Sequence, residues 1–297
     1  MVVMGQLAQA LILGLLVGGV YALASSGMSL IFGVMKVANL AQGAMLILSS
    51  YLTYTLWEAT GLDPLVLVLL TTPSLLLVGW VTYYLVVERS RTTDASMALV
   101  TTFGLALVTK GVIALVWGND LHSVSPGYAN RSFAVLGMKL PQAQVYATMV
   151  AAAVLVALYV LLTRTWLGRS IRATATSSEG ARLIGIDVRR TWAASYAIGI
   201  AAAGAGGSLL SVLYPFMPST SDHWIGLLLS IIVLGGMGSL PGSVVGALLI
   251  AVAESLTTTY VSPDWATAVP YVAIIAVLVI RPQGLLGARL REDMSRA

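Results

Sequence analysis

Long apolar runs, separated by short polar stretches, are the dominant pattern along the chain. A helix that crosses a bilayer needs about 20 consecutive, mostly apolar residues, and runs of this kind predict about eight or nine transmembrane or re-entrant helices. They cover residues 7–33, 41–56, 65–87, 97–117, 144–163, 193–214, 224–239, 241–260 and 267–281. The pattern therefore predicts an all-α, polytopic membrane protein, with residues 1–297 forming a single transmembrane domain.

Two of the predicted segments differ from an ordinary spanning helix. The segment 7–33 is long enough to be kinked or to form two short helices. The segment 224–239 is short and bounded by glycines, which favours a re-entrant helix. Gly14 and Gly18 are four residues apart, a spacing that lets two helix backbones approach closely and predicts tight packing.

The composition agrees with a membrane protein. Hydrophobic residues make up 58% of the 297 and charged residues only 9%, whereas a soluble domain carries about 25% charged residues. Lipid must therefore cover much of the surface. The chain has no cysteine, and its two histidines, His122 and His223, lie far apart in the sequence, so we predict no metal site.

The distribution of basic residues predicts how the chain is oriented. Thirteen of the sixteen lysines and arginines fall in connections that one orientation places on the same side. They are Lys36, Arg89, Arg91, Arg164, Arg169, Arg172, Arg182, Arg189, Arg190, Arg281, Arg289, Arg291 and Arg296. Lys and Arg accumulate on the cytoplasmic side of membrane proteins, so this orientation puts the N-terminus outside and the C-terminus in the cytoplasm. Residues 164–192 then form a cytoplasmic loop, and residues 118–143 form the longest outer loop.

The cytoplasmic loop contains the pattern E-x-A-x-x-x-G, formed by Glu179, Ala181 and Gly185. Ser177 or Ser178 can cap a helix N-terminus by accepting backbone N–H bonds. Glu179 suits the first turn of such a helix, and Gly185 suits its end. The pattern predicts a short helix outside the membrane, with small residues that let another surface pack closely. An ordinary polar loop is the alternative.

Four sequence motifs occur in order along the chain. They lie at residues 21–43, which include the run N-L-A-Q-G at 39–43, and at residues 167–188, 233–246 and 281–285. Together they resemble the permease subunits of the branched-chain amino-acid ABC importer family, and the resemblance covers nearly the whole chain. It implies the ABC-importer permease fold. It also implies coupling to an ATPase through Ser177, Ser178, Glu179, Gly180, Ala181 and Gly185.

The resemblance implies a multi-pass, pore-forming subunit in the inner membrane of a bacterium. Such a subunit moves a branched-chain or other hydrophobic amino acid, using ATP that partner subunits hydrolyse. The expected partners are two ABC ATPase subunits, a second homologous permease in a heterodimer, a periplasmic or lipid-anchored solute-binding protein, and membrane lipid. No nucleic acid is expected.

The glycine-rich motif at residues 233–246 is not a phosphate-binding loop. Its run G-G-M-G is not followed by Lys-Ser or Lys-Thr, so it is not a Walker A element. We therefore expect this chain to bind no cofactor, and Mg–ATP to be bound by the partner ATPases. Glycine permits a tight break between two helical segments, and broken helices in transporters often line the substrate path. The expected path residues are Gly235, Gly236, Gly238 and Ser239.

Asn39 and Gln42 are further candidates for the path. They are three residues apart, so on a helix they share one face; hydrogen bonding between helices is the alternative role. The family typically has histidine at the position of Gln42 and often an acidic residue at that of Ala44. A path lined by this stretch would be less polar here. A permease of the same architecture for an aromatic acid, an amide or a sugar therefore stays an alternative.

Two charged residues, Lys110 and Glu254, fall inside predicted spans. Ionisable groups within a membrane are costly and face the bundle interior or a wet cavity. A rise of about 1.5 Å per residue places both at similar depth, in the outer half of the membrane. We predict that they pair or face the same cavity; separate contacts with other polar groups are the alternative.

Two other functions compete with that of an ABC permease. A membrane-embedded enzyme would need clustered nucleophiles, bases or metal ligands, and the sequence carries neither H-E-x-x-H nor G-x-S-x-G. We therefore predict no catalytic residues. An ATP-independent secondary transporter would have no use for the E-x-A-x-x-x-G loop, which argues against it.

Overall fold

A computed structural model describes residues 2–91, 95–135, 137–281 and 283–287 of the chain. Pro282, Arg289, Arg291 and Arg296, which contributed to the predictions above, lie outside the described residues. The helices are α1 (Val2–Met35), α2 (Gln42–Thr60), α3 (Pro64–Thr82), α4 (Glu88–Arg91), α5 (Ala95–Trp117), α6 (Gln142–Arg164), α7 (Trp166–Thr176), α8 (Ser178–Leu183), α9 (Val188–Leu213), α10 (Thr220–Gly235), α11 (Leu240–Tyr260), α12 (Pro263–Ala266) and α13 (Val269–Ile280). A π-helical turn, η1 (Tyr83–Val87), joins α3 to α4, and two strands, β1 (Ser132–Val135) and β2 (Met138–Pro141), form a hairpin.

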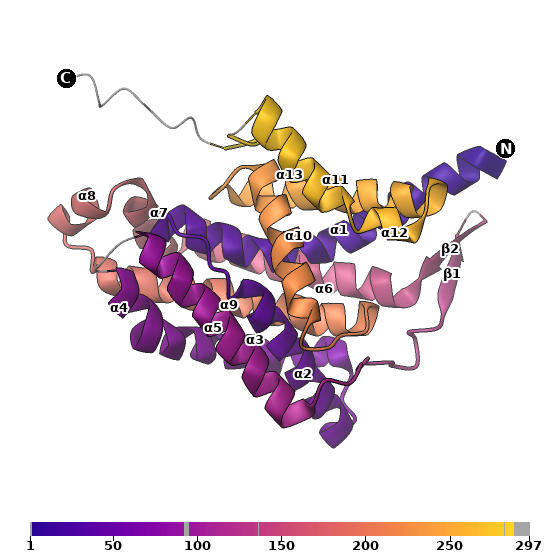
Figure 1. Cartoon of the computed structure of the whole chain (residues 1–297), viewed down its shortest axis with the longest axis horizontal. Coiled ribbons are helices and arrows are strands. Elements are labelled where there is room, and N and C mark those ends of the chain that lie inside the picture. Colours follow the sequence, from indigo (N-terminus) through magenta and orange to yellow (C-terminus); the bar gives the residue numbers. More distant parts are fainter. Residues whose placement is uncertain (1, 92–94, 136, 282, 288–297) are drawn as a thin grey trace.

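These helices confirm a polytopic, helical membrane protein (Figure 1). Within the described residues, seven helices are long and apolar enough to cross a bilayer, and α10 is a shorter apolar helix. Each of the nine predicted segments coincides with a helix. Helix α1 is unbroken over 34 residues, so the prediction of two short helices there is wrong. Helix α10 has 16 residues. Its length of about 24 Å is less than the roughly 30 Å of a hydrocarbon core.

Helix α9 forms the centre of the bundle. Of its most apolar stretch, 94% is buried inside the molecule, against 44% or less for the other six spanning helices. Residues 201–207 are all alanine or glycine, and they let α1, α2 and α3 pack closely around it. A Cβ atom on Gly199 would lie 2.7 Å from the carbonyl oxygen of Gly27, so the α1 and α9 backbones touch there. Because lipid is as apolar as the helices, such close approach is what holds helices together in a membrane.

Helix α1 packs in the same way on α11. A Cβ atom on Gly14 would lie 2.7 Å from the Cα atom of Val252, and one on Gly18 would lie 3.1 Å from the Cα atom of Leu248. The close packing that the glycine spacing predicts is therefore confirmed.

Buried hydroxyl groups fasten α2 and α3 to α9. The Ser49 Oγ atom donates to the carbonyl oxygen of Gly204 (2.5 Å), and Thr53 Oγ1 donates to Ser208 Oγ (2.7 Å). Thr71 Oγ1, on α3, lies 2.6 Å from the same Ser208 oxygen. No water is present inside a bilayer to compete for these groups, so the network fixes the relative position of the three helices.

The two ends of the bundle carry different elements. Figure 1 shows α7 and α8 at one end and the β1–β2 hairpin, with the N-terminus, at the other. In the hairpin, Ser132 pairs with Pro141 and Val135 with Met138. The hairpin lies in the segment 118–143, which the sequence predicted as a loop. The sequence did not reveal the two strands, because strands of four residues are too short to show a clear alternating pattern.

The remainder of the segment 118–143 is anchored to the bundle. The backbone N–H of His122 donates to the carbonyl of Phe216, and that of Phe216 donates back (2.9 and 2.8 Å). The Tyr128 hydroxyl donates to Asp63, the N-cap residue of α3 (2.9 Å). Burial and the Asp63 carboxylate raise the pKa of the Tyr128 phenol well above its ordinary value, so this hydroxyl stays protonated and keeps donating.

Basic residues gather at the end that carries α7 and α8. On the described chain these are Lys36, Arg89, Arg164, Arg169, Arg172, Arg182, Arg189, Arg190 and Arg281. Arg131 and Lys139 lie at the hairpin end. The predicted grouping on one side therefore holds for the described residues.

The close contact at Gly207 predicts a large loss of stability when a side chain is introduced. A Cβ atom there would collide with the carbonyl oxygen of Leu46 on α2, so Gly207→Val should lower the free energy of unfolding by about 3 kcal/mol or more. Gly104→Val is the matched control, because a Cβ atom on Gly104 meets no atom within 4 Å. Thermal unfolding in detergent measures both; equal stability of the two variants would contradict the central packing of α9.

Candidate functional site

Helix α8 begins with the cap that its sequence predicts. Ser177 is the N-cap residue, and its Oγ atom accepts a hydrogen bond from the N–H of Gly180 (3.1 Å). Ser178 is the first helical residue, so of the two serines only Ser177 is the cap. Glu179 lies in the first turn, where the helix dipole stabilises a negative charge.

Helix α8 ends at a glycine in the left-handed region. Gly185 has φ +82°, and its N–H donates to the carbonyl of Arg182 (3.0 Å). The N–H of Ile186 donates to the carbonyl of Ala181 (3.0 Å), which completes a Schellman ending. Residues other than glycine are strained at this φ value, so Gly185 has a specific structural role.

Helix α8 presents apolar side chains away from the bundle. The Leu183 side chain is 88% exposed and that of Ile184 is 72% exposed, whereas Ala181 is buried against the protein. Large apolar groups are therefore exposed beside Glu179 and Arg182, at a charged end of the bundle. The sequence pattern pointed to the small residues of α8 but did not identify Leu183 and Ile184.

Asn39 and Gln42 form one buried junction between helices. The Asn39 Nδ2 atom donates to Gln42 Oε1 (3.3 Å), and Gln42 Nε2 donates to the carbonyl of Gly199 on α9 (3.1 Å). Gln42 thereby binds α9 at the point where Gly27 of α1 crosses it. Asn39 lies before α2 begins, and its Oδ1 accepts from the N–H of Ala41 (3.2 Å). The bond from Gln42 to Gly199 is a hydrogen bond between helices, the alternative role considered for this pair, whereas the bonds of Asn39 are local. A place of the pair on the substrate path stays a prediction.

The glycine-rich motif breaks the helical run as predicted. Helix α10 ends at Gly235, Gly236 and Gly238 have φ +105° and +83°, and Ser239 caps α11 by accepting from the N–H of Gly242 (3.1 Å).

The same glycines receive two other parts of the chain. The N–H groups of Leu285 and Leu286 donate to the carbonyls of Leu234 and Gly235 (2.8 and 2.9 Å). On α1, a Cβ atom on Gly33 would lie 3.0 Å from the carbonyl oxygen of Gly238. The motif is thus a backbone junction of α1, α10, α11 and residues 283–287; a place on the substrate path stays a prediction.

Lys110 pairs with Asp222 rather than with Glu254. Its Nζ atom lies 2.6 Å from the Asp222 Oδ2 atom, so the predicted pairing of Lys110 with Glu254 is wrong. Asp222 lies in the first turn of α10, two residues before the apolar segment that the sequence delimits. Asp222 therefore lies outside the predicted span 224–239. The pair lines a cavity of about 280 Å³ between α5 and α10.

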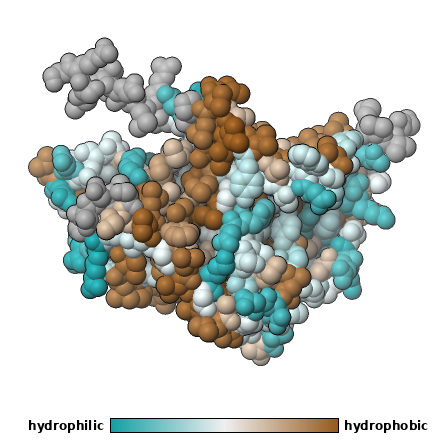
Figure 2. Space-filling model, viewed as in Figure 1, coloured by the Kyte–Doolittle hydropathy of each residue, from teal (hydrophilic) through white to brown (hydrophobic). Residues whose placement is uncertain are grey.

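Glu254 faces a second cavity, of about 500 Å³. Tyr21, Tyr214 and His223 share its wall, and the two tyrosine hydroxyl oxygens lie 3.4 Å apart. Asp222 and His223 are consecutive on α10 and line different cavities, so α10 separates the two. Figure 2 shows a narrow column of hydrophilic side chains near the middle of this face, with hydrophobic surface to its left. The described residues therefore place Lys110 and Glu254 in two cavities and not in one.

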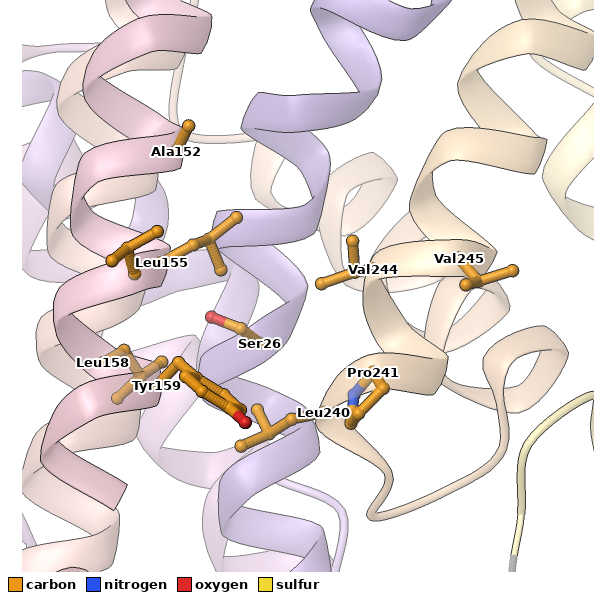
Figure 3. Close-up of a pocket in the computed structure, with 10 residues that line it drawn as sticks. Ser26, Ala152, Leu155, Leu158, Tyr159, Leu240, Pro241, Val244 and Val245 are labelled. Atoms are coloured by element: carbon orange, nitrogen blue, oxygen red, sulfur yellow. The ribbon is translucent and has the colours of Figure 1, made fainter. Parts of the chain in front are cut away.

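A third cavity, of about 550 Å³, differs in being almost entirely apolar. Figure 3 shows it between α6 and α11, with α1 behind; Leu155 and Tyr159 approach from α6, and Leu240 and Val244 from α11. Ser26 reaches it from α1, and its hydroxyl already donates to the carbonyl of Leu23 (2.7 Å). This groove offers apolar contact but few groups that could recognise a charged solute.

Comparison with known proteins gives one family over nearly the whole chain. Residues 10–278 match the model of the branched-chain amino acid transport system permease component. The LivH permease of Escherichia coli strain K12 is 26% identical over 92% of this chain and 93% of its own length. The BraD permease of Pseudomonas aeruginosa is 27% identical over 94% and 95%. The LivM permease of Escherichia coli strain K12 is 29% identical, over 45% of this chain and 32% of its own length. No solved structure matches the chain significantly.

The junction at Gln42 predicts a measurable effect on stability. Gln42→Leu removes the bond to Gly199 and leaves the Asn39 amide without its acceptor, so it should lower the free energy of unfolding by about 1–2 kcal/mol. Gln6→Leu, at an exposed position of α1, is the control and should change it little. Unfolding in detergent provides the comparison. Altered transport with unchanged stability would instead place Gln42 on the substrate path.

Proposed function

The chain belongs to the family of permease components of branched-chain amino acid transport systems, and from this membership we propose that it is the pore-forming subunit of an ABC importer in a bacterial inner membrane. The observation that carries the proposal is the match to the family model over residues 10–278. The LivH and BraD relatives, which are named as high-affinity branched-chain amino acid permeases, support a branched-chain or other hydrophobic amino acid as the substrate. The chain itself acts as a transport subunit and not as an enzyme.

Energy for transport comes from Mg–ATP bound and hydrolysed by two partner ATPase subunits. Helix α8 is the docking element, with Ser177, Glu179, Ala181 and Gly185 shaping it. Its exposed Leu183 and Ile184 provide apolar contact area, and they support this assignment because lipid does not cover a helix that lies beyond the apolar spans.

Two further partners complete the proposed importer. A second, homologous permease pairs with this chain, a proposal supported by its similarity to both LivH and LivM of one bacterium. A solute-binding protein contacts the outer hairpin and the segment 118–143. The direct hydrogen bonds of this segment to Phe216 and Asp63 hold its backbone in place as a docking surface.

The chain is oriented with α7 and α8 in the cytoplasm and with the hairpin and N-terminus outside. The gathering of basic residues at the α7–α8 end supports this orientation.

A permease for another small solute, such as an aromatic acid, an amide or a sugar, is the second candidate. Gln42 and Ala44 favour it, because the first replaces a histidine, and the second an acidic residue, that relatives typically or often have. Uptake of leucine, an aromatic acid, an amide and a sugar by the purified importer separates the two candidates.

Changes on α8 should uncouple ATP hydrolysis from transport without unfolding the chain. We expect Glu179→Lys and Leu183→Ser each to reduce ATP-driven uptake about tenfold or more, because docking residues at the centre of an interface contribute about 2 kcal/mol or more. Leu115→Ser is the matched control, since Leu115 on α5 is also 88% exposed but lies within an apolar span. Normal uptake by both α8 variants would contradict the proposed docking surface.

Single cysteines should report the orientation cleanly, because the chain has none of its own. Ser125 and Thr176 are both exposed and lie at opposite ends of the bundle. A membrane-impermeant maleimide added to intact cells should label Ser125→Cys and should label Thr176→Cys only after the membrane is opened. The reverse pattern would invert the topology.

A further inference from the structure

The ion pair between Lys110 and Asp222 occupies an unusual position. Lys110 lies in the membrane-spanning helix α5, seven residues before its end at Trp117, and the pair lines an otherwise largely apolar cavity. Charged side chains are expensive in the membrane and typically mark a substrate or ion pathway. An ion pair whose acidic member is largely exposed contributes little to stability by itself. Its presence therefore calls for a functional explanation.

The pair opens toward the cavity instead of being enclosed by protein. The Asp222 side chain is 73% exposed and that of Lys110 is 29% exposed, so a small solute can reach both charges. The lining of the cavity comes mainly from α5 and α10, with Tyr271 contributed by α13. The polar residues of α10 lie mainly in its first turn, at residues 220–223.

The rest of the cavity wall is suited to an aliphatic group. Leu40 and Ala44 contribute from the α1–α2 junction and α2, and Leu107, Ile225 and Leu229 from α5 and α10. The volume of about 280 Å³ is at the small end of ligand-binding sites, which matches a solute of amino-acid size.

The junction of Asn39 and Gln42 holds one wall of this cavity in place. The N–H of Leu40 donates to Thr102 Oγ1 on α5 (3.3 Å), and the neighbouring Asn39 and Gln42 side chains fix the turn to α9. Leu40 and Ala44 therefore line the cavity while Asn39 and Gln42 lie behind them.

We propose that the Lys110–Asp222 pair binds the zwitterionic head group of the transported amino acid. The Lys110 ammonium binds the α-carboxylate, the Asp222 carboxylate binds the α-ammonium, and the aliphatic side chain lies against Leu40, Ala44 and Ile225. This proposal rests on the proposed function. It adds that the solute must carry both a carboxylate and an ammonium group. A solute that lacks either charge is attracted by only one member of the pair, so it binds less tightly than a zwitterion.

The direct test exchanges the two charges. The double variant Lys110→Asp with Asp222→Lys keeps an ion pair between α5 and α10 but reverses the charges relative to the apolar wall. With the complete importer in proteoliposomes, we expect unchanged co-purification of partners and an unchanged melting temperature. We expect uptake of radiolabelled L-leucine to fall about tenfold or more.

A second variant covers the case in which the exchanged pair does not assemble. Lys110→Met with Asp222→Leu replaces the pair by apolar side chains, and such replacements are typically neutral or stabilising. It should assemble with its partners and take up little L-leucine. If the ion pair only fastens α5 to α10 and has no role in binding, uptake will stay normal in whichever variant assembles. That result overturns the proposal.

The failure of this site and the failure of the proposed function give different results. If the unmodified importer takes up leucine and the variants do so equally well, the Lys110–Asp222 site is wrong and the proposed function stands. If the unmodified importer takes up no leucine, isoleucine or valine but transports a sugar or another uncharged solute, both this site and the proposed amino-acid substrate are wrong.

Discussion

The close approach of α9 to α1, α2 and α3 is the interaction on which the rest of the structure depends. Apolar side chains gain little by leaving lipid for one another, so helices in a bilayer associate through backbone contact and polar groups. Here the contact needs glycine at Gly27, Gly199 and Gly207, where a Cβ atom would strike a carbonyl oxygen of a neighbouring helix. The hydroxyl of Ser208 adds bonds to α2 and α3. A rigid, buried α9 is the consequence, and the other helices are placed relative to it.

The position of α9 also connects the two functional regions along the chain. Its first residue, Val188, follows three residues after Gly185, which ends α8, and its last, Leu213, precedes the short connection to α10. Near its start, Arg189 forms an ion pair with Glu88 of α4, with a second hydrogen bond of 2.8 Å between Nη2 and Oε2. The single buried helix α9 is therefore the covalent connection between α8 and α10, which the two cavities flank.

Much of the fold could be predicted from the sequence, because lipid imposes a strong and regular pattern on spanning helices. The nine apolar segments, the cap at Ser177, the ending at Gly185 and the break after Gly235 all depend on local chemistry, which a linear pattern retains. The partner of Lys110 could not be predicted, because it depends on where α5 meets α10. The same holds for the docking of Leu285 and Leu286 on the glycine-rich motif, and for the hairpin, whose strands are too short to leave a pattern. Exposure of Leu183 and Ile184 likewise follows from the way α8 packs.

We propose that the chain forms the membrane pore of an importer that is driven by ATP hydrolysis on other subunits, with α8 as its contact to them. The most direct measurement is uptake of radiolabelled L-leucine into proteoliposomes that contain the importer purified through this chain. With the solute-binding protein outside, we expect uptake that requires Mg–ATP on the α8 side and stops when a non-hydrolysable analogue replaces it. Leucine uptake driven by a proton or sodium gradient, without ATP, would contradict it.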